Sequence, residues 1–420
     1  MAMAMAMDLH CLHVAGLTGL QGTVPRFSPP LVSLGSRCLN AGCSRGLLRR
    51  NSVAITVRGS TSCRRLRGES CCRAQSRDAA TVEVAIDGKI DDVVPVLNLS
   101  EVTERMQSLS KTRPEIFRAM YSSVIGGITT DPAAMVIPMD DHMVHRGHGV
   151  FDTAIIYNGF LYELDTHLDR LLRSAASSKI KSPFDRATLR HILLQTVAAS
   201  GCRRGSLRYW LSAGLGGFGL SSKECYKSTF YAIVSDNTYK GPEGVKVVTT
   251  TIPIKPPFFA TVKSVNYLPN VLAQLEAEEQ GAFTAVWLDS EGYIAEGPNM
   301  NIAVLSKDGV LLIPPFDNVL AGCTARRMLE LVPTLMEKKL VAGLVGVKVQ
   351  KISVQEAKSA SEMMLIGSGV LVKSIIEWDG LPVGNGNVGP LTSAIREAVQ
   401  RDLEDITAEK LVPVPYASGL

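Results

Sequence analysis

A lysine and a glutamate in the second half of the sequence suggest where its chemistry lies. Lys263 stands between apolar residues in the segment TVKSVNY, residues 261–267, just before a predicted helix. An amine in apolar surroundings loses solvation of its ammonium form and becomes nucleophilic toward carbonyl groups. Glu296 ends a short apolar segment, where a carboxylate is costly without a cationic partner. These residues alone leave two interpretations open, a buried ion pair and a reactive centre.

Ordered motifs around these residues resemble one enzyme family over about residues 140–410. The motifs are GVFD at 149–152, HLDRL at 167–171, KSVNYLPN at 263–270, EGPNMN at 296–301, GCTAR at 322–326 and GSG at 367–369. Their order and spacing resemble the fold-type IV pyridoxal-phosphate enzymes, which include branched-chain aminotransferases, D-amino-acid transaminases and aminodeoxychorismate lyases. The wording of the motifs is most similar to plant chloroplast D-amino-acid transaminase-like and branched-chain aminotransferase-like proteins.

The resemblance implies a cofactor, pyridoxal 5'-phosphate, and roles for three charged residues. Lys263 matches the lysine that bonds the cofactor aldehyde and later moves the substrate proton. Glu296 matches the carboxylate that faces the pyridine nitrogen and keeps it protonated. Arg170 matches the guanidinium that binds the phosphate, for which its planar fork is suited. The resemblance also implies a homodimer with the cofactor between two domains.

Four further positions match the family less specifically. The hydroxyls of Thr324, at a predicted helix start, and Ser368, between two glycines, would complete a phosphate site. Tyr267 and Asn301 would support the cofactor site from positions next to the residues that contact the cofactor directly. Each also has an ordinary structural interpretation: a helix cap for Thr324, a turn for Ser368, a core position for Tyr267 and an Asx turn for Asn301.

The sequence departs from the family at the segment GGFGL, residues 216–220. D-amino-acid transaminases of bacteria carry an Arg-x-His pair there, and aminodeoxychorismate lyases tend to carry an arginine. Another group must therefore bind the substrate carboxylate. The hypothesis from sequence is that Arg146 and His148 do so, because they directly precede a strand expected to line the pocket, and Arg208 is a further candidate.

Histidine and cysteine positions give little support for other chemistry. His142, His145 and His148 have the spacing H-x2-H-x2-H, but the neighbouring glycines indicate a loop and no supporting carboxylate pair is placed. We therefore expect no metal site. Cys323 adjoins Thr324, yet no histidine can be paired with it from sequence, so a buried structural thiol is expected.

Composition separates the first 77 residues from the rest. Of 44 basic and 40 acidic residues in the 420-residue chain, this stretch holds 11 arginines, no lysine and only two acids. Such an arginine-rich, serine-rich and acid-poor start is typical of an organelle transit peptide, and the resemblance favours the chloroplast. The alternative is a retained basic arm. The remaining 33 basic and 38 acidic residues give a net charge of −5, which argues against a nucleic-acid partner.

Two domains are expected after that segment, with an α+β architecture. Strands alternate with isolated helices without a regular βαβ repeat, and residues 235–244 break the periodicity. The sequence therefore predicts a transit peptide at 1–77, a small N-terminal α+β domain at 78–236 and a large domain carrying Lys263 at 237–420. No apolar run reaches the ~18 residues that span a bilayer, so no membrane partner is expected.

The elements that must position the site follow from local patterns. Helices are expected over 114–120, 185–199 and 268–280, after Thr166 as cap, and after Thr324. Strands are expected over 149–157, 160–164, 206–214, 228–234 and 245–251, the first two joined by the turn Asn158-Gly159.

The function predicted from these observations is transamination between a D-amino acid, for example D-alanine, and a 2-oxo acid. Two alternatives use the same lysine. One is an aminodeoxychorismate lyase that yields p-aminobenzoate and pyruvate, and the other is a branched-chain L-amino-acid aminotransferase. A cofactor-binding protein without turnover is a fourth interpretation, against which the intact Lys263 and Glu296 argue, since folding requires neither.

Overall fold

The computed structural model describes residues 94–112, 116–236, 241–407 and 409–417. The chain divides into two units, Met1–Ala80 and Thr81–Leu420, and every described residue belongs to the second. The expected transit peptide, residues 1–77, lies outside the described residues. Within those residues, none of the helices combines the length and the hydropathy needed to cross a membrane.

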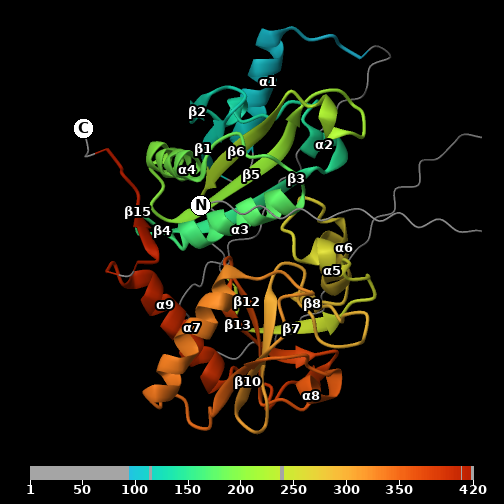
Figure 1. The fold of residues 1–420 in the computed structure, drawn as a ribbon, viewed down its shortest axis with the longest axis vertical. Coiled ribbons are helices and arrows are strands. Elements are labelled where there is room, and N and C mark those ends of the chain that lie inside the picture. The colour runs from blue at the N-terminus through green and yellow to red at the C-terminus, as the bar shows by residue number, and fades with distance from the viewer. Residues whose placement is uncertain (1–93, 113–115, 237–240, 408, 418–420) are drawn as a thin grey trace, which may run out of the picture. The chain divides into compact units, whose positions relative to one another are not determined.

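A seven-stranded antiparallel sheet is built mainly from the first half of the described chain (Figure 1). Its strands follow the order β15-β4-β3-β5-β6-β1-β2. They are β1 (Phe117–Ser122), β2 (Gly127–Thr129), β3 (Gly149–Tyr157), β4 (Phe160–Tyr162), β5 (Gly205–Leu215), β6 (Lys227–Ser235) and β15 (Leu411–Pro413). Because β15 returns from the C-terminal end to pair with β4, this sheet is not confined to residues before 237.

The helices in this part of the chain are α1 (Leu99–Thr112), α2 (His142–Arg146), α3 (Leu164–Ser177) and α4 (Arg186–Ser200), with short 3-10 turns at Pro132–Ala134 and Ser222–Glu224. Helix α3 packs on β3 and α4 on β1 and β6, whereas α1 buries none of its residues. Leu168 and Leu171 of α3 and Leu189 and Leu193 of α4 are fully buried in one cluster with the inner faces of β3, β5 and β6. The apolar residues recur every three or four positions, which places them on one helix face.

A second, eight-stranded sheet is formed by later residues, in the order β11-β10-β9-β12-β13-β7-β8 with β14 paired to β13. Its strands are β7 (Gly244–Thr249), β8 (Thr284–Val286), β9 (Asn301–Leu305), β10 (Val310–Ile313), β11 (Gly346–Val349), β12 (Glu362–Gly367), β13 (Leu371–Trp378) and β14 (Leu381–Pro382). The helices are α5 (Pro257–Ala260), α6 (Leu268–Glu279), α7 (Cys323–Glu337), α8 (Val354–Lys358) and α9 (Pro390–Glu404). Helices α7 and α9 pack together against β12 and β13.

Most predicted elements near the site are confirmed. The hairpin of β3 and β4 turns at Asn158-Gly159, where both residues have positive φ. The predictions of helix over 185–199 and 268–280 agree with α4 and α6, and α7 begins beside Thr324. The mixture of largely antiparallel sheets and separate helices confirms the α+β fold.

Two local predictions are wrong. Residues 117–122 form strand β1 rather than part of a helix over 114–120, because pairing with β6 on one side and β2 on the other satisfies their backbone groups. The helix expected after Thr166 begins earlier, at Leu164, where the chain turns through a left-handed residue, Glu163, with φ 51°. Thr166 therefore lies in the first turn and is not the cap.

Candidate active site

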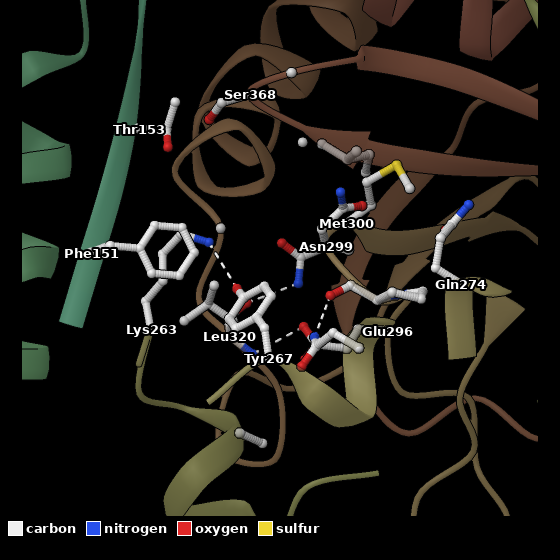
Figure 2. Close-up of a pocket in the computed structure, with 18 of the residues that line it drawn as sticks. Phe151, Thr153, Lys263, Tyr267, Gln274, Glu296, Asn299, Met300, Leu320 and Ser368 are labelled. Atoms are coloured by element: carbon white, nitrogen blue, oxygen red, sulfur yellow. Dashed lines mark hydrogen bonds between the residues drawn. The ribbon is translucent and has the colours of Figure 1, made fainter. Parts of the chain in front are cut away.

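A cavity of about 480 Å³ lies where strand β3 of the first sheet faces the loops and helix ends of the second (Figure 2). Phe151 and Thr153 of β3 form one wall. Tyr267 and residues of α6 form another, and the start of α7 with residues 366–369 forms a third. Five of the residues predicted to bind the cofactor, Arg170, Tyr267, Glu296, Thr324 and Ser368, line this single cavity together with Lys263.

Backbone pairing with β3 fixes the position of Lys263. The carbonyl of Lys263 accepts a hydrogen bond from the Phe151 N–H at 3.0 Å, and the Val265 N–H donates to the Gly149 carbonyl at 3.0 Å. The Lys263 amine then donates to the Tyr267 hydroxyl at 3.1 Å and lies 4.6 Å from the centroid of the Phe151 ring. Figure 2 shows the amine and hydroxyl pointing at each other in the cavity. The amine is thus held at a defined point with its lone pair accessible once deprotonated.

Glu296 is a buried carboxylate at the opposite end of the cavity. Its side chain is 5% exposed and accepts a hydrogen bond from the Leu320 N–H at 3.1 Å. Burial raises the pKa of Glu296 from 4.5 to about 7, although Lys255, the Leu320 N–H and Lys263 all favour the charged form. No ion pair joins it to Lys263 among the contacts of the described residues, so the simple buried-pair interpretation does not describe this arrangement.

Arg170 belongs to a buried cluster with two residues to which the sequence assigned no role. Its Nε and Nη2 donate to the Asp152 carboxylate at 2.8 and 2.7 Å, and its Nη1 donates to the Ala321 carbonyl at 3.2 Å. His167 Nδ1 lies 2.8 Å from the same carboxylate. Burial would raise the pKa of Asp152, but Arg170 and His167 lower it well below its usual value. The cluster therefore holds Arg170 charged and rigid beside the cavity.

The start of α7 completes the polar end of the cavity. Thr324 lies in the first turn of this helix, and its hydroxyl is 3.3 Å from that of Ser368, which is 3.5 Å from His167 Nε2. The first backbone N–H groups of a helix attract anions. Gly322 precedes the helix, where a Cβ would collide with the Asn301 amide oxygen. Arg170, the two hydroxyls and the helix start thus form a corner of the cavity that is suited to an anion.

Arg146 and His148 do not line this cavity. The Arg146 guanidinium donates to the carbonyls of His145 and Phe218, and His148 bonds the Ser178 carbonyl at 2.8 Å and His142 Nδ1 at 3.2 Å. The structure therefore does not bring the proposed carboxylate pair to Lys263 of the same subunit. Among the described residues, no three His, Cys, Asp or Glu side chains are grouped to hold a metal ion.

Arg208, the further candidate, does line the cavity. Its Nε donates to Thr153 Oγ1 at 3.2 Å, and its guanidinium carbon lies 5.8 Å from the centroid of the Phe151 ring. It has no carboxylate partner within the described part of the chain, so its remaining donors face the cavity without a competing acid.

Asp152 and Lys255 were missed by the sequence reasoning. Asp152 lies on the buried face of β3, on which every second residue (Val150, Ala154 and Ile156) is otherwise apolar. An acid at such a position must have a cation nearby, and this alternation was a usable signal. Lys255 lies in the loop before α5, and nothing in its local sequence places it against Tyr267.

Comparisons with known proteins agree with this geometry. Residues 149–378, more than half of the chain, match the family described as amino-transferase class IV. The chain is 57% identical over 325 residues to a D-amino-acid transaminase, chloroplastic, of Arabidopsis thaliana, covering 77% of this chain and 86% of that protein. The chain belongs to the class IV aminotransferases. A D-alanine aminotransferase of Bacillus licheniformis is 27% identical over 68% of this chain and 98% of its own length.

Solved structures of branched-chain aminotransferases share the fold of this aminotransferase. The Thermobaculum terrenum enzyme in its PLP-bound form gives a TM-score of 0.62 at 19% identity, over 71% of this chain and 99% of that chain. The Escherichia coli enzyme gives 0.62 at 22% identity over the same shares. These values, together with the family match, confirm the predicted fold-type IV architecture.

The cavity fits pyridoxal 5'-phosphate, the cofactor of class IV aminotransferases. It offers a free amine on one wall, a buried carboxylate that can face a ring nitrogen, and an anion-binding corner for a phosphate. Arg170, Thr324 and Ser368 would hold the phosphate, Glu296 the nitrogen and Lys263 the aldehyde carbon. As an aminotransferase, the protein acts on an amino acid and a 2-oxo acid.

The raised pKa of Glu296 predicts a pH-dependent loss of stability in the cofactor-free protein. The folded state retains the carboxyl proton up to about pH 7, whereas the unfolded chain releases it near 4.5. Folding is therefore favoured at low pH, and this contribution is lost as pH rises from 4.5 to about 7. Relative to Glu296→Gln, which does not titrate, the wild type should lose roughly 3 kcal/mol of unfolding free energy between about pH 4.5 and 8.

Urea unfolding of both cofactor-free proteins across this range measures the effect. Comparing the two proteins removes the contribution of every other titrating group, because those groups are shared. A difference between wild type and variant that stays constant with pH would show that folding does not raise the pKa of Glu296.

Proposed function

We propose that this aminotransferase exchanges an amino group between a D-amino acid, such as D-alanine, and a 2-oxo acid. The observation that carries the proposal is the 57% identity, over 86% of its length, to the Arabidopsis protein named as a D-amino-acid transaminase. The assembled cavity supports it, because the residues assigned to the cofactor line a single cavity of one chain.

In the proposed mechanism, Lys263 is the catalytic acid and base. Bound pyridoxal phosphate supplies the electron sink that stabilises negative charge at the substrate Cα. Lys263 would take the proton from the substrate Cα onto its Nζ, and its hydrogen bond to Tyr267 holds the amine in one direction. Glu296 in its ionised form would hold the ring nitrogen protonated, and the Leu320 N–H fixes that carboxylate.

We further propose that Arg208 binds the substrate carboxylate. A guanidinium can make two parallel hydrogen bonds to a carboxylate, and Arg208 is exposed in the cavity beside Phe151 and Thr153. Arg146 instead bonds two backbone carbonyls and would have to break them to reach a substrate. Arg208 therefore takes the place first given to Arg146 and His148.

A branched-chain L-amino-acid aminotransferase remains the second candidate. A putative branched-chain-amino-acid aminotransferase of Methanocaldococcus jannaschii is 28% identical over 65% of this chain and 93% of that protein. The lower identity gives it less support. The aminodeoxychorismate lyase alternative has no observation in its favour beyond the shared lysine.

A second copy of the chain is the partner we propose. Six apolar side chains on and before α6 are exposed next to the cavity: Phe258, Phe259, Leu268, Val271, Leu272 and Leu275. Val271 and Leu275 also line the cavity, so a second copy covering this patch would close the site to water. Patches of this kind on soluble proteins mark interaction surfaces.

We propose the chloroplast as the location, with residues 1–77 as the transit peptide. The support is the composition of those residues and the chloroplastic relative from Arabidopsis thaliana. Import of the full-length chain into isolated chloroplasts, with shortening by about 77 residues, is the expected result. Import into mitochondria alone would contradict this location.

Lys263→Ala should lower the rate of transamination at least ~1000-fold, because it removes both the general acid–base group and the covalent attachment of the cofactor. The protein should stay folded, because Tyr267 accepts the only hydrogen bond that the amine donates among the described residues. Borohydride reduction should attach the cofactor permanently to the wild type and to the surface control Lys307→Ala, but not to Lys263→Ala. Mass spectrometry reads out the attachment, and labelling of Lys263→Ala at another lysine would refute the assignment.

The substrate assay tests the function itself. Wild-type enzyme should convert D-alanine and a 2-oxo acid to pyruvate and a D-amino acid, measured by chiral chromatography. Turnover of L-leucine in place of D-alanine would establish the branched-chain alternative. Pyruvate released from aminodeoxychorismate without a 2-oxo acid would establish the lyase.

Arg208→Gln should raise KM for both substrates and lower kcat/KM by about tenfold or more, because a charge-assisted bidentate contact is lost. Arg146→Gln and the surface control Arg186→Gln should stay near wild type. Steady-state kinetics of the three variants decide between the candidates. A large KM effect in Arg146→Gln with none in Arg208→Gln would reverse the assignment.

Leu272→Glu should convert the proposed dimer to a monomer of half the mass, since a carboxylate would be buried in an apolar interface. Leu340→Glu, at an exposed leucine away from α6, is the matched control and should leave the dimer intact. Light scattering after size exclusion measures the masses. A wild type with the mass of one chain would contradict the proposal.

A further inference from the structure

Lys255 lies in the cavity near Lys263 and Glu296, although it belongs to none of the sequence motifs of the site. It is half-buried in the loop before α5, and its ammonium lies 4.9 Å from the centroid of the Tyr267 ring. The hydroxyl of that ring accepts the hydrogen bond from Lys263. Lys255, Tyr267, Lys263 and Glu296 all line the same cavity. Lys255 is thus a second lysine in the cavity that holds Lys263.

Within the part of the chain that the structure describes, the ammonium of Lys255 forms no direct ion pair, and it lies over the face of Tyr267. An ammonium over an aromatic face is stabilised by the ring's negative quadrupole. This contact holds the ammonium in place at the wall of the cavity, where its charge can act on other groups that line the cavity.

Glu296 is the buried acid on which this field acts. The charged groups that favour its ionised form are Lys255 from the loop before α5 and Lys263 from the loop before α6, with the Leu320 N–H between them in strength. Lys263 is committed to the cofactor aldehyde in the loaded enzyme, so its positive charge is not constant. Lys255 has no such assigned bond, because the aldehyde is assigned to Lys263. It is therefore the lasting counter-charge for the buried carboxylate.

We propose that Lys255 is a positioning residue that shifts Glu296 toward its ionised form, the form that would receive the protonated ring nitrogen of the cofactor. It acts through the cavity, not by touching the reacting atoms. The inference rests on the assignment of Glu296 made above. Because it concerns the ionisation of one carboxyl, it does not depend on which amino acids are transaminated.

Infrared difference spectroscopy of the full chain without cofactor tests the proposal directly. The C=O band of protonated Glu296 is identified as the band missing in Glu296→Gln, and its midpoint is followed with pH. In Lys255→Met this midpoint should rise by about one pH unit, the order expected for one partly screened charge. Lys255→Arg keeps the charge and should stay within about 0.3 units of wild type.

A second readout uses the cofactor as ligand. The affinity for pyridoxal phosphate, measured by quenching of protein fluorescence, should fall below the pH at which Glu296 takes up its proton. The position of this fall should move upward by the same one unit in Lys255→Met. A loss of packing alone would change the affinity at all pH values without moving the fall. Lys307→Met, in the exposed turn between β9 and β10, is the matched control.

An unchanged Glu296 midpoint in folded Lys255→Met would overturn the proposal. A higher KM for the 2-oxo acid with an unchanged midpoint would also overturn it and make Lys255 a substrate-binding residue instead. Should Lys255→Met fail to fold, Lys255→Gln compared with Lys255→Arg decides the question by the same midpoint. If transamination of D-amino acids is absent while the midpoint shifts as expected, the proposed substrate is wrong and the role of Lys255 stands.

Discussion

The attachment of the lysine segment to strand β3 is the constraint on which the site depends. Two backbone hydrogen bonds, from Phe151 to Lys263 and from Val265 to Gly149, join a loop that belongs to the second sheet to a strand of the first. Backbone bonds of this kind fix direction as well as distance. The amine therefore enters the cavity at one point, and the walls contributed by the two sheets are held in register around it.

Charge balance explains how the rest of the cavity is organised. Asp152 is fully buried, and it is stable there because Arg170 and His167 surround it with donors and positive charge. Glu296 is also buried, but within the described part of the chain it receives a single N–H and no direct ion pair. One acid is thus locked in its ionised form, while the other stays close to its titration point and responds to its surroundings. A carboxylate near its titration point can gain or lose its proton when the charges around it change.

The sequence was sufficient to predict which residues lie together where the prediction rested on local motifs. Lys263, Glu296, Arg170, Thr324 and Ser368 meet in one cavity, and helices α4 and α6 and the hairpin of β3 and β4 follow from periodicity and turn chemistry. Predictions that depended on tertiary pairing were less successful. The local sequence of β1 predicts a helix, and only its pairing with β6 and β2 makes it a strand. Arg146 is adjacent in sequence to a strand of the cavity, but its side chain bonds the Phe218 carbonyl instead of entering the cavity.

The substrate carboxylate illustrates why proximity along the chain is a poor guide to a site. Arg146 precedes β3, but the helix α2 that carries it ends in a left-handed glycine, Gly147, and its N-cap Asp141 is held by Thr229 and Tyr231 of β6. These contacts fix the loop where the Arg146 side chain bonds backbone carbonyls outside the cavity lining. Arg208 is far from Lys263 in sequence, yet β5 runs beside β3 with Arg208 opposite Thr153. Sheet register, which no single segment encodes, brings Arg208 to the cavity, whereas sequence adjacency does not bring Arg146 there.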